Sequence, residues 1–119
     1  MNVEQYRDYC LSLKAVSESF PFDEDALVFK VLTKMFSLTS LSRQPLRIHL
    51  KCDPDYAIEL RERYESVEPA FHMNKKHWIM VECESGEIPE EEIYQWIRDS
   101  YDLVVSKMTK KDKELLKNM

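Results

Sequence analysis

The sequence predicts an α+β fold in which helices pack on an antiparallel sheet in two layers. Residues 27–51 alternate apolar and polar side chains, as half-buried strands do. Residues 2–13, 53–65 and 89–108 instead repeat apolar residues every three or four positions, as amphipathic helices do. The predicted order is helix, three strands, helix, two strands, helix and a short C-terminal helix, which is typical of an α+β fold.

The first half of the chain is predicted to contain one helix and a three-stranded meander. Asn2–Leu13 has the helical repeat, and Ala15–Ala26 is predicted to be a loop anchored by aromatic residues. The strands are expected at about Leu27–Val31, Met35–Ser40 and Leu46–Lys51.

The second half is predicted to hold two strands between helices. Asp53 and Pro54 are a typical helix start, and three glutamates after Pro89 suit the positive end of the longest helix. Thr109 is expected to cap the last helix. The expected elements are a helix from Pro54 to near Glu65, strands Val67–Phe71 and Trp78–Cys83, and helices beginning at Pro89 and Lys110.

The composition is that of an ordinary globular protein, with 44% hydrophobic and 33% charged residues. We expect residues 1–119 to form a single domain. No window approaches the roughly 18 consecutive apolar residues of a membrane span, and the first residues carry no apolar run typical of a signal peptide. A cytoplasmic protein without a membrane partner is therefore expected.

Cysteine, glycine and histidine usage argues against several kinds of site. Cys10, Cys52 and Cys83 are far apart in the sequence, so reduced, half-buried thiols are expected. The single glycine excludes a glycine-rich phosphate loop, and we expect no cofactor.

Metal binding and catalysis are not expected either. Four residues are of metal-ligand type, but no pair of them has tight zinc spacing. They are His49, Cys52, His72 and His77. No nucleophile elbow is present, and Asp23 and Asp25 are interpreted as solvating a loop. We therefore expect a protein that is not an enzyme.

The residues from Ala26 to Cys52 carry five Lys or Arg residues and no Asp or Glu, in a chain of formal net charge −5. Strand alternation places one polar set on a single sheet face, with Trp78 within reach on the fifth strand. That set is Lys30, Arg47, His49 and Lys51. Cations beside an aromatic platform are typical of a nucleic-acid surface. The alternative is a solvated face with no ligand.

A second candidate site is the polar stretch from His72 to Trp78. Its histidines, lysines, amide and indole could hold a phosphate or carboxylate; these residues are His72, Asn74, Lys75, Lys76, His77 and Trp78. The structural alternative is that Met73 and Trp78 pack while Asn74 builds the turn. The basic segment from Lys107 to Lys117 is interpreted as a solvated helix end, with phosphate contact as the alternative.

Several segments, in this order, resemble the MmcQ/YjbR family. They are Phe20-Pro21-Phe22-Asp23-Glu24-Asp25, Leu27-Val28-Phe29-Lys30-Val31, Lys34-Met35-Phe36, Leu50-Lys51-Cys52-Asp53-Pro54, His72-Met73-Asn74-Lys75-Lys76-His77-Trp78 and Ser100-Tyr101-Asp102-Leu103-Val104-Val105. The resemblance implies a small cytosolic bacterial protein with a two-layer fold similar to CyaY and to secretion chaperones. Members of that family are described as DNA-binding, largely because of their fold.

Together these observations predict a non-enzymatic DNA-binding protein. The lysines and arginine of the sheet face and of the 72–78 loop would contact phosphate, while His77 and Trp78 would stack or donate hydrogen bonds. The alternative is a protein-interaction module, chaperone-like or adaptor, with no nucleic-acid partner. Oligomeric state is not predicted.

Overall fold

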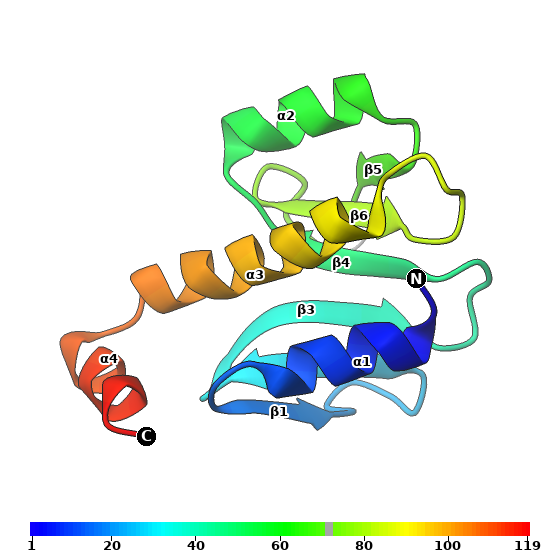
Figure 1. The fold of residues 1–119 in the computed structure, drawn as a ribbon. Helices are drawn as coiled ribbons and strands as arrows, with labels where there is room; N and C mark the ends of the chain where they lie inside the picture. The colour runs from blue at the N-terminus through cyan, green and yellow to red at the C-terminus, as the bar shows by residue number, and fades with distance from the viewer. Residues whose placement is uncertain (71–72) are drawn as a thin grey trace.

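The computed structural model describes residues 1–70 and 73–119, and it shows helices packed on one face of a six-stranded antiparallel sheet (Figure 1). The strands are β1 (Val16–Ser19), β2 (Ala26–Val31), β3 (Lys34–Ser40), β4 (Arg47–Lys51), β5 (Val67–Pro69) and β6 (Trp78–Glu82). Their order in space is β1-β2-β3-β4-β6-β5. The predicted α+β fold with an antiparallel sheet is confirmed.

The helices form a single layer. They are α1 (Val3–Ser12), α2 (Pro54–Arg63), α3 (Glu90–Ser106) and α4 (Lys110–Lys117). Helix α1 packs beside β1, α2 against β5 and β6, and α3 across β2, β3 and β4 (Figure 1). No helix of the described residues crosses the opposite side of the sheet, which we call the open face. None of these helices is both long and apolar enough to cross a membrane.

Side-chain caps fix where three of the helices begin. Asn2 accepts a hydrogen bond from the backbone N–H of Gln5 at 2.8 Å, and the Gln5 side chain accepts one from Asn2 at 2.9 Å. This reciprocal pair is a capping box. Asp53 caps α2 by accepting from the backbone of Tyr56 at 3.1 Å, and Thr109 caps α4 in the predicted way.

The prediction of a loop over residues 15–26 is wrong for Val16–Ser19, which form the edge strand β1. This strand pairs with β2 through residues such as Val16 and Val31. Its other three residues are polar, so it shows no apolar alternation in the sequence. Glu18 instead forms a bidentate ion pair with Arg7 of α1, in which two guanidinium nitrogens each donate to a carboxylate oxygen at 2.6 Å. A charged edge strand of this kind resists pairing with other chains.

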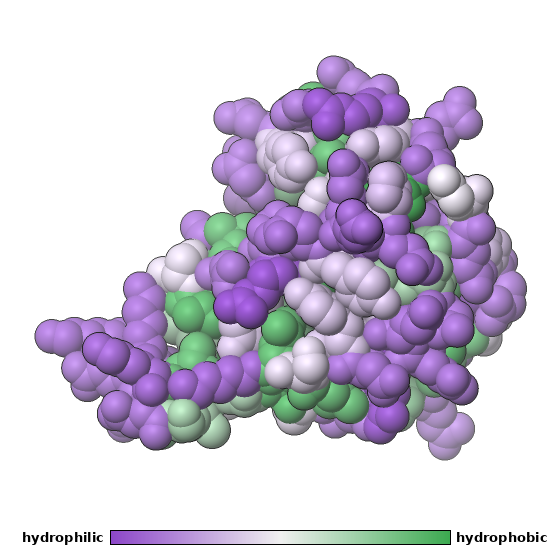
Figure 2. All heavy atoms as spheres, viewed as in Figure 1, coloured by the Kyte–Doolittle hydropathy of each residue, from purple (hydrophilic) through white to green (hydrophobic). Residues whose placement is uncertain are grey.

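The hydrophobic core lies between the helix layer and the sheet. Its large, fully buried side chains include Tyr6, Phe29, Val31, Phe36, Ile48, Leu50, Leu60, Ile79, Ile93 and Ile97. Burying each such side chain contributes about 1.5–3 kcal/mol to stability. The outer surface of the helix layer is largely hydrophilic, most clearly over α2 and α4 (Figure 2).

Ser100 of α3 ties the centre of the sheet to the helix layer. Its hydroxyl donates to the carbonyl of Phe36 at 2.6 Å and accepts from the backbone N–H of Lys51 at 2.8 Å. The pairing of β2 with β3 is irregular at this point, between Phe29 and Lys30. The buried hydroxyl therefore satisfies backbone groups at the irregularity and fixes the position of Lys51.

Candidate nucleic-acid interface

Strand register determines which side chains lie on the open face. Cross-strand partners share a face, and residues alternate along each strand. The open-face residues are Ser17, Ser19, Ala26, Val28, Lys30, Met35, Leu38, Ser40, Arg47, His49, Lys51, Glu68, Trp78, Met80 and Glu82. Lys30, Arg47, His49, Lys51 and Trp78 are all in this set, so the alternation in the sequence assigns them to one face correctly.

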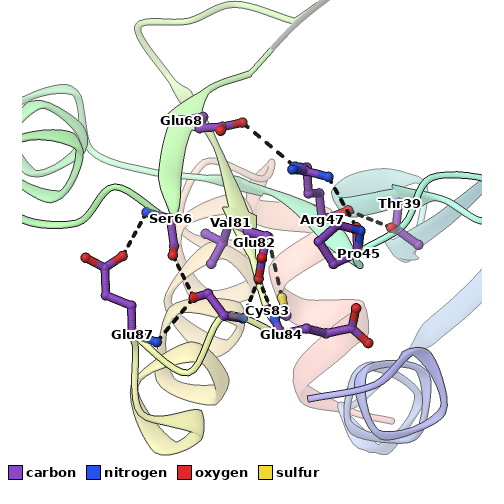
Figure 3. A network of polar contacts seen from close by, with 11 residues as sticks. Thr39, Pro45, Arg47, Ser66, Glu68, Val81, Glu82, Cys83, Glu84 and Glu87 are labelled. Carbon is purple, nitrogen blue, oxygen red and sulfur yellow. Dashed lines mark hydrogen bonds and ion pairs between the residues drawn. The ribbon is translucent and has the colours of Figure 1, made fainter.

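The open face is nevertheless not uniformly basic. Glu82 lies directly opposite Arg47 in the β4–β6 pairing, and Arg47 Nε lies 3.9 Å from a carboxylate oxygen of Glu68 (Figure 3). The carboxylate of Glu82 accepts hydrogen bonds from the backbone N–H groups of Glu84 and Ser85. The open face therefore carries acidic side chains from β5 and β6 beside its cations.

His49 and Trp78 lie on the open face but are buried, with exposed fractions of 8% and 9%. A base needs an accessible ring face to stack on. These two side chains therefore lie beneath the surface of the open face and do not offer a ring for stacking.

The described part of the 72–78 loop is built around Asn74. Its side chain accepts from the backbone of Lys76 at 3.0 Å, and its carbonyl accepts from the backbone N–H groups of His77 and Trp78. The carbonyl of His77 accepts from Cys52 at 2.8 Å, which joins the loop to the end of β4. Lys75 and Lys76 are exposed, while the predicted site residue His72 lies outside the described residues.

A groove of about 530 Å³ lies on the open face. It is lined by Phe22, Ala26, Met35, Leu38, Ser40, Arg43, His49 and Met73. Because Met35 and Ser40 stand near opposite ends of β3, the groove follows this strand for about 16 Å. Its described lining is mostly apolar, includes Arg43 and contains no acidic residue.

Of the groove residues, His49 was among the predicted site residues, and the other seven were not. Ala26, Met35 and Leu38 were visible in the sequence only as apolar residues of their strands. Met35 and Leu38 are three positions apart, so they share a face only because the β2–β3 pairing is irregular between Phe29 and Lys30. Phe22 and Met73 come from loops, and 69% of the Phe22 side chain is exposed. No periodic pattern places a loop side chain over a sheet, so these two residues could be found only from the structure.

The acidic residues beside the groove have structural roles. Asp23 accepts from the backbone of Asp25 and Ala26 at 2.8 and 2.7 Å. The carboxylate of Asp25 accepts from the Ser40 hydroxyl and from the backbone of Ser42. These hydrogen bonds, led by the one from Ser40, lower the pKa of Asp25. The cluster therefore holds the loops at the end of the groove in place.

The cysteines are buried thiols that form no disulfide. Burial raises the pKa of Cys52 to about 11 and that of Cys83 to about 12. A thiolate is the reactive and metal-binding form, so these groups are poorly suited to either chemistry at neutral pH. Within residues 1–70 and 73–119, no group of three or more His, Cys, Asp or Glu side chains is placed to hold a metal ion.

Comparison with known proteins gives several full-length relatives. The chain is 38% identical over 111 residues to the "Uncharacterized protein YbdF" of Escherichia coli O157:H7, covering 93% of this chain and 90% of the relative. It is 28% identical over 116 residues to the "Uncharacterized protein YjbR" of Escherichia coli strain K12, covering 98% of each. These names assign no activity to the relatives.

Solved structures share the fold. The crystal structure of Deinococcus radiodurans protein DR2400 matches with a TM-score of 0.89 and 41% identity, covering 97% of this chain and 87% of that chain. A protein from Pseudomonas syringae matches with a TM-score of 0.74 and 29% identity, covering 87% of this chain and 99% of that chain.

The sequence model of the family described as YjbR matches residues 11–103. The chain therefore belongs to the YjbR family.

Proposed function

We propose that this chain binds single-stranded DNA along the open face of its sheet, without catalysing a reaction on it. The observation that carries the proposal is the groove along β3, which is mostly apolar and is bordered by cations. Arg43 lines the groove, and Lys30 is the direct cross-strand partner of Met35. Proteins that bind single strands combine a surface for bases with cations for phosphates.

The groove suits an unstacked base better than a duplex. In a duplex the flat faces of the bases are covered by stacking, whereas in a single strand they are available for apolar and aromatic contact. Phe22 offers an exposed ring, and Met35, Leu38 and Met73 offer polarisable apolar contacts. We therefore assign base contact to Phe22 and to the apolar residues of the groove, in place of the predicted stacking on Trp78.

The cations of the open face would contact phosphate. Lys30 and Lys51 lie on the face itself, and the exposed Lys76 belongs to the loop that also supplies Met73 to the groove. Arg47 forms an ion pair with Glu68, so we expect it to contribute less to phosphate binding than the lysines do. The net charge of −5 disfavours long-range approach of DNA, but at physiological salt charges are screened beyond about 8 Å. Close to the surface, the cations of the open face would therefore determine whether a phosphate binds.

A titration of a fluorescently labelled oligothymidylate, followed by anisotropy, tests the proposal. We expect binding that weakens with salt, with a logarithmic slope of about −0.7 for each phosphate neutralised. The variant K30Q/R43Q should bind more weakly and with a shallower slope. The control K111Q/K113Q removes the same charge from exposed positions of α4 that do not line the groove. No binding at low salt, or equal loss in both variants, would contradict the proposal.

A protein-interaction module is the second candidate function, and the apolar lining of the same groove favours it. An extended peptide could place apolar side chains against Phe22 and Leu38. Such binding would depend weakly on salt and would change little in K30Q/R43Q. Salt dependence therefore separates the two functions in one experiment.

A further inference from the structure

Three lysines line a second pocket, next to the groove. It has a volume of about 220 Å³ and lies where β3 begins and where β4 and α3 end. Lys34 comes from the start of β3, Lys51 from the end of β4, and Lys107 from the C-terminal end of α3. The remaining lining residues are Met35, Val104 and Met108. The described lining is therefore entirely basic or apolar.

Among the described residues, none of the three ammonium groups forms an ion pair with a carboxylate within 4.0 Å. Among the described residues, the ion pairs involve Arg7, Arg47, Arg63, Arg98 and the N-terminal ammonium, and none of the three lysines. No acidic side chain lines the described pocket. Like charges that border one pocket repel one another, and an anion between them would relieve that repulsion.

A purely structural role, without a ligand, explains the position of only one of the three lysines. Lys107 stands at the C-terminal end of α3, where a cation interacts favourably with the helix dipole. Lys34 and Lys51 belong to strands, so the same argument does not apply to them. The side chain of Ser100 holds the backbone of Lys51 in place. This hydrogen bond therefore fixes the backbone position from which the Lys51 side chain extends.

The pocket is of a suitable size and polarity for a phosphate group. Its volume equals that of several water molecules at about 30 Å³ each, which leaves room for a tetrahedral anion. Val104 and Met108 are buried and form an apolar wall. Lysine binds phosphate as a point charge, and the interaction is stronger beside apolar groups than in open water.

We infer that Lys34, Lys51 and Lys107 form a binding pocket for a phosphate group. Met35 lines both this pocket and the groove, so one ligand could place a base in the groove and a phosphate among the lysines. The assignment of this phosphate to a DNA strand rests on the proposed function. The pocket itself would accept a phosphate of any source.

Binding of pyrophosphate, followed by calorimetry and by amide chemical shifts, tests the pocket directly. The variant K34Q/K107Q changes two exposed positions, and K111Q/K113Q serves as the control of equal charge. We expect K34Q/K107Q to bind at least about tenfold more weakly and the control to stay within about twofold of the unmodified chain. Chemical-shift dispersion shows whether each variant is folded. No binding by the unmodified chain, or equal binding by both variants, would overturn the inference.

The same variants titrated with an oligothymidylate identify the source of the phosphate. If the phosphate belongs to the strand, K34Q/K107Q should weaken oligonucleotide binding and reduce the salt slope by about 0.7 for each lost contact. Oligonucleotide binding that is unaffected by K34Q/K107Q would overturn the assignment of this phosphate to a DNA strand, while the proposed function stands. Pyrophosphate binding that needs the lysines, together with no oligonucleotide binding, would support the pocket and contradict the proposed function.

Discussion

Arg47 Nε on β4 and a carboxylate oxygen of Glu68 on β5 lie 3.9 Å apart on the open face, with β6 between their strands (Figure 3). Both side chains are partly exposed, and a pair of this kind contributes about 0–1 kcal/mol to stability. The pair matters more for the electrostatics of the face, because it offsets one cation that would otherwise be available to a phosphate.

Removing the charge of Glu68 should therefore strengthen DNA binding. In E68Q, Arg47 loses its partner, so the oligothymidylate should bind about two- to fivefold more tightly and with a slope steeper by about 0.7. The control E62Q removes an acidic residue from an exposed position of α2. An equal change in both variants, measured by anisotropy, would show that only net charge matters.

Replacing Phe22 should lower affinity without unfolding the protein. Since 69% of this side chain is exposed, F22A should change the free energy of unfolding by no more than about 0.5 kcal/mol. Loss of a base-stacking ring costs about 1–3 kcal/mol of binding free energy. Leu115, which is 53% exposed on α4, provides the control L115A. Unchanged oligonucleotide affinity in F22A would remove Phe22 from the interface.

A buried hydrogen-bond chain beneath the groove should contribute to stability. The hydroxyls of Tyr6 and Ser37 lie 2.6 Å apart, and Ser37 donates to the carbonyl of His49 at 2.8 Å. S37A leaves buried polar groups unsatisfied and should cost about 1–3 kcal/mol, whereas Y6F should cost about 0.5–1.5 kcal/mol. In urea unfolding, the double variant should lose less than the sum of the two single losses. Full additivity would show that the hydroxyls do not act together.

The hydrogen bonds to Asp25 should make stability sensitive to acid. Its folded pKa is lowered, first by the Ser40 hydroxyl and then by Ser42, so the unfolded chain binds the proton more readily. The contribution of the carboxylate is present above its unfolded pKa of about 3.9 and is lost as pH falls through the folded value.

The variant D25N tests this dependence. The difference in unfolding free energy between the unmodified chain and D25N should be largest near neutral pH and should shrink below about pH 4. E24Q, at an exposed neighbouring position, should show no such trend. A difference for D25N that stays constant down to about pH 3 would contradict the assignment.

The sequence predicts the sheet well where its own alternation carries the information. Residues 27–51 alternate clearly, so the meander and the shared face of Lys30, Arg47 and Lys51 could be predicted from them. The strand at Val16–Ser19 could not, because a polar edge strand held by an ion pair shows no apolar period.

The character of the open face depends on long-range pairing. The acidic side chains of Glu68 and Glu82 reach it only because β6 lies between β4 and β5. The burial of Trp78 and the position of Phe22 also depend on tertiary contacts. Local sequence therefore predicted that Lys30, Arg47, His49 and Lys51 share the face, whereas the groove along it required the structure.

Chemical-shift mapping with a short oligothymidylate at low salt would show whether the groove binds single-stranded DNA. We expect amide shifts to change along β3 and its neighbouring loops, at Phe22, Met35, Leu38 and Arg43, with little change on the outer surface of α2. Changes confined to the helix layer, or no changes at all, would contradict the proposed DNA-binding surface.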